Sequence, residues 1–151
     1  MNTPKHYTIV SGKGFSKYKL VAFDIALLNA GIGDYYLVKV SSILPTGCQY
    51  EKNIDIEKGS VVYAAYSTVT VKEKQKMTTA VAVAIPSNVA ESGVIFESSS
   101  DSGEAENDVC NMCMEAMKNR NKNIKEIKST SITVSGKSGG YVSGISAVIL
   151  W

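Results

Sequence analysis

Two adjacent serines, Ser41 and Ser42, are the residues of this sequence whose types and spacing are best suited to a chemical reaction. They follow an apolar, β-branched run and precede Ile43-Leu44-Pro45. By composition alone, serines at the end of a strand cap backbone groups or begin a turn. If the peptide between them is strained and held rigidly, however, the Ser42 hydroxyl is placed to attack the Ser41 carbonyl and to convert the amide into an ester.

Such an ester would allow the chain to make its own electrophile. Elimination across Ser42 would release Ser41 as a new carboxyl terminus and leave a dehydroalanine, and hydrolysis of its enamine tautomer would give a pyruvoyl group. Protein side chains supply no good electron sink, whereas an imine conjugated with a carbonyl delocalises the carbanion that a decarboxylation leaves. The serine pair is therefore compatible with a decarboxylase cofactor made from Ser42.

A second spacing that could do chemistry is Cys110-Asn111-Met112-Cys113. A zinc site would need two further ligands, and outside this motif only Cys48 and His6 carry a thiol or an imidazole. A redox motif of this spacing normally opens a helix, but this one falls in the middle of a predicted helix. We therefore predict buried or half-buried helix cysteines and no metal site.

Charge and hydropathy exclude several classes of partner. The 151 residues include 16 basic and 14 acidic side chains, with no basic stripe, so no nucleic-acid partner is expected. No run approaches the roughly 18 apolar residues that span a bilayer, and the N-terminus lacks the apolar core of a signal peptide. Three cysteines cannot all pair, and we expect a protein of the reducing cytoplasm without a membrane partner.

Periodic patterns predict the elements that must position the serines. Apolar residues recur at helical spacing over 17–30 and again over 104–121. Runs rich in β-branched and aromatic residues predict strands at 6–11, 35–43, 61–71, 78–85, 93–97, 124–134 and 141–151. The first strand is expected to close at Gly12-Lys13-Gly14, and residues 46–58 and 98–103 are expected to form turns or loops.

Two helices are too few to cover both faces of a parallel sheet. The strands at 61–71, 78–85 and 141–151 are apolar or small on both faces, as expected of strands enclosed between layers. We therefore predict an α+β protein with two mixed sheets face to face and one helix outside each. The order of elements also indicates a structural duplication with one extra strand.

Several segments closely resemble the pyruvoyl-dependent arginine decarboxylases. The most specific is AFDIALLNAGIG at 22–33, followed by VSSILP at 40–45. The similarity continues through TAVAVAIP at 79–86, GVIFE at 93–97 and AVILW at 147–151. It spans most of the chain and keeps the order of the elements.

The resemblance implies a proenzyme of one domain, residues 1–151, which cleaves into a small chain, 1–41, and a large chain, 42–151. It implies a four-layer α/β/β/α sandwich built from a duplicated β-α-β-β unit, in agreement with the element order. It also implies a homotrimer or a dimer of trimers with the active site between neighbouring subunits. The implied reaction converts L-arginine to agmatine and CO2 through a Schiff base with the pyruvoyl group of Ser42.

Two acidic residues match the family's functional positions. Asp24 matches the residue that meets the substrate guanidinium, which a carboxylate binds through two parallel hydrogen bonds. Glu97 matches the acid that protonates the carbanion after CO2 leaves, so it must start protonated and a dry environment should raise its pKa. Ser41, beside the new pyruvoyl group, is expected to join Asp24 in substrate binding.

The sequence departs from the family at Tyr36, where members commonly carry an asparagine near the processing site. A tyrosine hydroxyl donates one hydrogen bond, but the side chain is longer and cannot copy an amide. The SSSD segment at 98–101 also differs. Two alternatives therefore stay open: the same chemistry on ornithine, lysine or histidine, and an uncleaved, non-catalytic trimeric relative.

Overall fold

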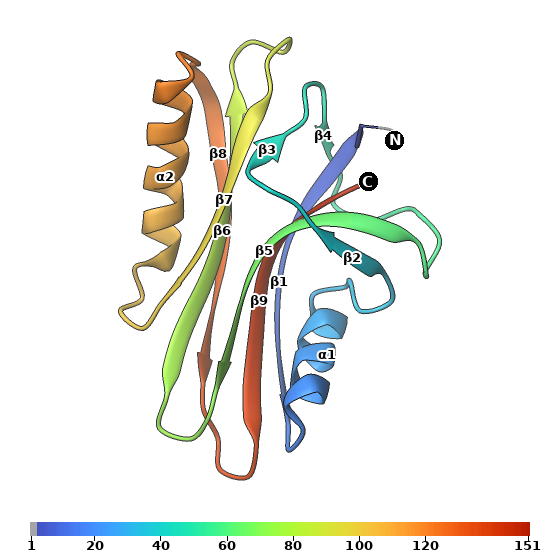
Figure 1. The fold of residues 1–151 in the computed structure, drawn as a ribbon, viewed down its shortest axis with the longest axis vertical. Coiled ribbons are helices and arrows are strands. Elements are labelled where there is room, and N and C mark those ends of the chain that lie inside the picture. The colour runs from blue at the N-terminus through green and yellow to red at the C-terminus, as the bar shows by residue number, and fades with distance from the viewer. Residues whose placement is uncertain (1–2) are drawn as a thin grey trace.

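The strands of the computed structural model, which describes residues 3–151, form two sheets that lie face to face, and a helix covers the outer face of each (Figure 1). The elements are β1 (His6–Ser16), α1 (Lys19–Asn29), β2 (Tyr36–Lys39), β3 (Ile43–Leu44), β4 (Gln49–Tyr50), β5 (Val61–Val71), β6 (Lys76–Pro86), β7 (Gly93–Ser100), α2 (Ala105–Asn119), β8 (Ile124–Ser135) and β9 (Tyr141–Leu150). The layers therefore follow as α1, the first sheet, the second sheet and α2.

The two sheets differ in their strand directions. The first has five strands in the order β2-β5-β9-β1-β4, and the second has four in the order β3-β7-β6-β8. In the first sheet β2 is parallel to β5 and β4 is parallel to β1, whereas β9 is antiparallel to both of its neighbours. The strand pairs of the second sheet are antiparallel.

The chain repeats one arrangement twice, as β1-α1-β5-β6 and as β7-α2-β8-β9. The first two strands of each unit lie in the same sheet, and its third strand inserts between the first two strands of the other unit. Thus β9 lies between β1 and β5, and β6 lies between β7 and β8. The predicted α+β sandwich with a duplicated β-α-β-β unit is confirmed in its architecture.

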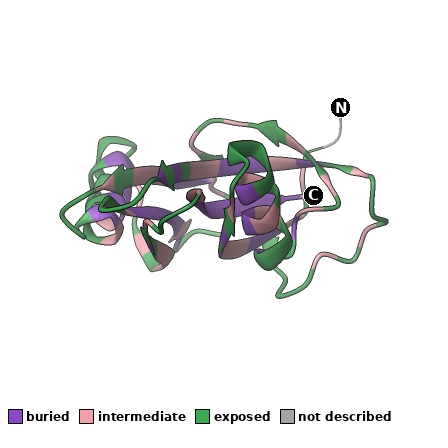
Figure 2. Ribbon diagram, turned by 90° about the horizontal axis from the view of Figure 1, so that it is seen from below, coloured by how far each residue is buried: buried purple, intermediate pink, exposed green. Residues whose placement is uncertain are grey.

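Three apolar layers hold this sandwich together. Along β6, Val81 and Val83 enter the layer between the sheets, while the alternate alanines 80, 82 and 84 face α2. Along β9, Val148 and Leu150 enter the central layer and Ile149 packs beneath α1. Both strands therefore read as apolar on both faces because both of their faces are covered. Figure 2 shows buried residues on the inner sides of the helices and exposed ones outside.

The prediction that the first strand ends at Gly12-Lys13-Gly14 is wrong. β1 continues to Ser16 and pairs with β9 along its length, from Tyr7↔Leu150 to Ser16↔Tyr141. A Cβ atom at Gly12 would overlap the backbone of Ala26 in α1, and one at Gly14 would overlap Ile25. These glycines therefore allow α1 to approach the strand closely, and they do not form a turn.

Other predicted boundaries shift for tertiary reasons. The strand predicted at 35–43 is interrupted, because β2 ends at Lys39 in one sheet and β3 begins at Ile43 in the other. β7 runs on to Ser100 because pairing with β6 continues to Thr78↔Ser100. The predicted turn region 46–58 contains the two-residue strand β4. The remaining helices and strands lie within two residues of their predicted bounds.

The helix cysteines lie as predicted. Cys113 is buried and Cys110 half-buried in the middle of α2, and both are free, as is Cys48. Burial raises the pKa of the Cys113 thiol to about 12, which makes it an unreactive core residue. Within residues 3–151, no helix has the length and apolar character needed to cross a membrane.

Candidate active site

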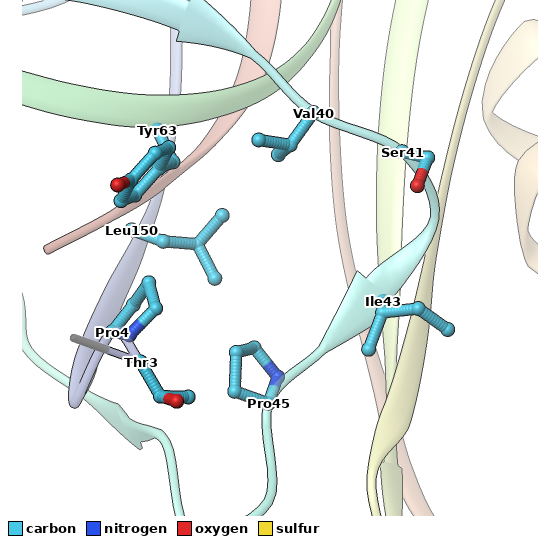
Figure 3. Close-up of a pocket in the computed structure, with 8 residues that line it drawn as sticks. All are labelled: Thr3, Pro4, Val40, Ser41, Ile43, Pro45, Tyr63 and Leu150. Carbon is cyan, nitrogen blue, oxygen red and sulfur yellow. The ribbon is translucent and has the colours of Figure 1, made fainter. Parts of the chain in front are cut away.

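Ser41 and Ser42 lie where the chain leaves one sheet and enters the other (Figures 1 and 3). β2 is an edge strand of the first sheet, and β3 is an edge strand of the second. The Val40 N–H still donates to the Ala64 carbonyl of β5 at 3.0 Å, and pairing with β7 begins at Ile43↔Val94. The two serines therefore bridge the sheets at an edge of the sandwich, and we call this segment, residues 40–43, the crossing.

The crossing is a tight turn held by backbone hydrogen bonds. The Ile43 N–H donates to the Ser41 carbonyl at 3.0 Å, which closes a three-residue turn centred on Ser42. The Ser42 carbonyl accepts a hydrogen bond from the Ile95 N–H of β7 at 2.9 Å. The carbonyl that the predicted attack would use is thus polarised by a donor, while residue 42 is fixed to a central strand.

Glu97 lies on β7, the strand whose Ile95 N–H binds the Ser42 carbonyl. It is two residues beyond Ile95, so both side chains point to the same face of the sheet, toward the layer between the sheets. The Glu97 side chain is half-buried, and burial raises the pKa of its carboxyl. This is the direction that a proton donor requires.

Lys39 acts on Glu97 in the opposite direction, and sequence reasoning gave it no role. It ends β2, and its ammonium lies 4.7 Å from the centre of the Tyr66 ring, in a cation–π contact. Its positive charge lowers the pKa of Glu97, but by less than burial raises it. A single lysine in a short strand resembles any exposed residue, so the sequence held no signal for this contact.

Asp24 is not brought to the crossing within one chain. It is exposed on α1, whose buried residues Ala22 and Ala26 face the first sheet instead. Figure 1 shows α1 displaced along the long axis of the molecule from the β2–β3 connection. Of the predicted site residues, the fold gathers Ser41, Ser42 and Glu97 around one edge and leaves Asp24 on an outer surface.

An apolar cavity of about 340 Å³ adjoins the Ser41 side of the crossing (Figure 3). Its walls come from the first sheet, from the crossing and from the start of the described chain: Thr3, Pro4, Val40, Ser41, Ile43, Pro45, Tyr63 and Leu150. The crossing thus has apolar surface on this side and Glu97 on the neighbouring strand.

Comparison with known proteins gives the family to which this four-layer fold with its serine crossing belongs. The family model for pyruvoyl-dependent arginine decarboxylase matches residues 6–151. The chain therefore belongs to the pyruvoyl-dependent arginine decarboxylase family.

Relatives from several archaea match along almost the whole chain, and each is named pyruvoyl-dependent arginine decarboxylase. The protein of Methanococcus aeolicus is 36% identical over 98% of this chain and 90% of its own length. That of Methanothermobacter thermautotrophicus is 37% identical over 91% of this chain and 92% of its own. That of Methanopyrus kandleri is 29% identical over 100% of this chain and 99% of its own.

Membership implies an enzyme with a covalently bound pyruvoyl group, and the residues at the crossing fit one. The group is small and uncharged, and apolar residues flank the serine pair, Val40 before it and Ile43 after it. The hydrogen bond from Ile95 would hold the amide carbonyl next to the ketone. Glu97 lies on the adjoining strand, and burial raises the pKa of its carboxyl.

Proposed function

We propose that this chain cleaves itself between Ser41 and Ser42 and then decarboxylates L-arginine to agmatine and CO2. The observation that carries the proposal is the tight turn at the crossing, in which the Ser41 carbonyl accepts a hydrogen bond from Ile43 at 3.0 Å. A carbonyl held in this way, directly before a serine, is prepared for attack by the next hydroxyl. Family membership makes this chemistry the expected one.

The cleavage balances without any external oxidant or reductant. The Ser42 Oγ bonds to the Ser41 carbonyl carbon, the C–N bond breaks, and the hydroxyl proton ends on the Ser42 nitrogen. Elimination then takes the Ser42 Cα proton and releases the Ser41 carboxylate, leaving a dehydroalanine with a free amino group. Water hydrolyses its imine tautomer, so that ammonia leaves and position 42 becomes a pyruvoyl group.

In the decarboxylation the protein side chains bind the substrate and hold a proton. The pyruvoyl group, once present, supplies the electron sink that the side chains lack. Glu97, whose burial favours the uncharged carboxyl, would deliver a proton to the carbon that has lost CO2. Ser41, now a chain end beside position 42, contributes to substrate binding.

Asp24 of one subunit would bind the guanidinium of a substrate held at the crossing of a neighbouring subunit. The subunits would form a homotrimer, or two such trimers stacked as a dimer of trimers. The exposure of Asp24 on α1 supports this proposal, as do the apolar side chains around it. Leu20 is 81% exposed and Leu28 is 50% exposed on the same helix. Such a surface is suited to covering by another copy, which would carry Asp24 toward a second crossing.

We also infer that the enzyme works in a reducing compartment, the cytoplasm. All three cysteines are free, and neither Cys48 nor the pair in α2 is bridged.

Intact mass spectrometry of the purified protein tests the processing step. We expect two fragments, residues 1–41 and residues 42–151, the larger with a blocked N-terminus. Ser42→Ala should stay intact, whereas Ser41→Ala, the matched control, should still cleave because the nucleophile remains. A wild-type chain that stays whole after long incubation would favour the uncleaved, non-catalytic alternative.

Release of CO2 from arginine, ornithine, lysine and histidine tests the substrate. Arginine should be turned over with the highest kcat/KM, because a guanidinium offers two parallel donors to the Asp24 carboxylate and an ammonium does not. A processed enzyme that prefers another of the four amino acids would correct the substrate while leaving the chemistry intact.

A further inference from the structure

The Ser41 carbonyl raises a question that the family resemblance leaves open. The resemblance described above implies an asparagine near the processing site, at the position where this chain carries Tyr36. Attack by Ser42 turns the Ser41 carbonyl oxygen into an oxyanion, and such an oxygen needs a hydrogen-bond donor already in place. The identity of that donor decides whether the tyrosine impairs cleavage.

Tyr36 of the same chain is badly placed for this task. It begins β2, where its N–H donates to the Ser60 carbonyl at 3.0 Å, and its side chain is 69% exposed. Five residues of extended chain separate it from Ser41, which is roughly 16 Å at the rise of a β-strand. That span exceeds the reach of a tyrosine side chain, so its hydroxyl could arrive only from another subunit.

We propose that the backbone N–H of Ile43 is the oxyanion donor of self-cleavage in this chain, in place of a side-chain amide. It lies 3.0 Å from the Ser41 oxygen in the uncleaved chain. Ile43 pairs with Val94 in β7, and the Ile95 N–H donates to the Ser42 carbonyl. Both contacts fix Ser42 and Ile43 to β7, and so they fix the position of the Ile43 N–H. Because the donor belongs to the backbone, it is independent of the residue at position 36.

The same hydrogen bond lies where negative charge develops during the reaction. As the Ser42 Oγ bonds to the Ser41 carbon, negative charge gathers on the oxygen that already accepts from Ile43. The charge returns to form the ester carbonyl when the C–N bond breaks, and the hydroxyl proton ends on the departing Ser42 nitrogen. The hydrogen bond becomes charge-assisted in the transition state and is stronger there than in the starting amide.

Replacing the Ile43 N–H by an ester oxygen tests this inference, which rests on the proposed self-cleavage. The chain is made with the α-hydroxy analogue of isoleucine at position 43, and cleavage is followed by intact mass. We expect cleavage about 10²-fold slower or more, the usual cost of losing one oxyanion donor. Mass also separates a cut at Ser41/Ser42 from hydrolysis of the new ester, one residue later.

Two control chains separate the loss of the Ile43 N–H from the other effects of the substitution. The ester at position 43 also weakens the Ser42 carbonyl as an acceptor. A second chain therefore carries the ester at position 95, which loses the anchoring hydrogen bond to Ser42 but keeps the Ile43 N–H. This chain should cleave less than tenfold slower than wild type. Tyr36→Phe should cleave within about twofold of wild type. Cleavage by the position-43 ester at the rate of the position-95 ester would overturn the proposal, as would a Tyr36→Phe chain slowed to the same extent as the position-43 ester.

A measurement on the uncleaved chain needs no turnover. In Ser42→Ala, a scalar coupling across the hydrogen bond between the Ile43 nitrogen and the Ser41 carbonyl carbon should be detected by NMR. A freely exchanging Ile43 amide without that coupling would contradict the geometry itself. If the wild-type chain never cleaves, the proposed function fails, whereas a cleaving wild type with an equally fast position-43 ester defeats this inference alone.

Discussion

The carboxyl group of Glu97 is subject to two opposing influences. Burial raises its pKa above the ordinary value near 4.5, and the Lys39 ammonium lowers it by a smaller amount. The group is protonated below its pKa and ionised above it, so a step that needs its proton slows as the pH rises through that value.

We therefore expect kcat for arginine to fall on the alkaline side with a single ionisation that belongs to Glu97. Glu97→Gln should still cleave at Ser41/Ser42 but lose about 10²- to 10⁴-fold in kcat, the usual worth of a general acid. Its remaining activity should show no such ionisation, which a pH–rate profile of the processed variant measures. A variant that kept the alkaline fall would assign it to another group.

Lys39 should set the position of this ionisation. Lys39→Met removes the charge that favours the carboxylate, so the pKa of Glu97 should rise and the alkaline fall should move to higher pH. Lys39→Arg, which keeps the charge and the contact with the Tyr66 ring, is the matched control and should leave the profile in place. A profile unmoved by Lys39→Met would show that the ammonium does not act on Glu97.

The resemblance to a family could point to serines and carboxylates because their side chains are distinctive. It could not point to the N–H groups of Ile43 and Ile95, since every residue except proline carries one. Their importance comes from the turn and from the register with β7, which only the folded chain displays. Asp24 was predicted as a site residue without any sign that its helix faces away from the crossing.

Among the elements, the pair β1 and α1 depends most on two small residues. Gly12 and Gly14 are both buried beneath the helix, and a methyl group at either would overlap atoms of α1. Replacing either by alanine should destabilise the uncleaved Ser42→Ala chain by about 1–3 kcal/mol, as overpacking does. Urea unfolding at fixed protein concentration measures this.

The matched control for these substitutions lies between them. Lys13 is exposed on the same strand, so Lys13→Ala should change the unfolding midpoint little. Equal midpoints for Gly12→Ala and Lys13→Ala would show that the helix can shift away at no cost.

Periodicity predicted the elements whose pattern is set by their own two faces. The bounds of β5 at 61–71 agree fully, and both helices were placed within two residues. The end of β1 was misplaced because glycine is typical both of turns and of positions where another element packs closely on a strand, and the sequence alone does not distinguish the two. The break after Lys39 was missed because β-branched residues stand on both sides of it, Val38 before and Val40 after, while the chain changes sheets.

At the scale of the whole molecule, Asp24 and the crossing lie on different parts of one chain. If neighbouring subunits complete each other's sites, two inactive variants should rescue one another. Coexpressed Asp24→Ala and Ser42→Ala chains should regain activity, with about a quarter of the sites intact under random mixing across a head-to-tail interface. Agmatine formation by the copurified mixture is the readout.

A second pair of variants provides the control. Glu97 and Ser42 lie around one edge of the same chain, so Glu97→Gln mixed with Ser42→Ala should stay inactive. Rescue by this pair, or failure of the first pair in a confirmed trimer, would show that the residues are shared between subunits differently.

The position of β1 between β9 and β4 in the first sheet has a consequence for refolding. β1, α1 and β2 all lie before Ser41, yet β1 is flanked by β9 and β4 and β2 pairs with β5, all of which follow Ser42. No disulfide joins the two parts. A cut at the crossing would therefore turn a unimolecular folding reaction into a bimolecular one, so that the stability of the mature protomer depends on concentration. We expect the chain to fold before the cut is made, and a mature enzyme that is unfolded and then diluted should recover its structure more slowly than the zymogen.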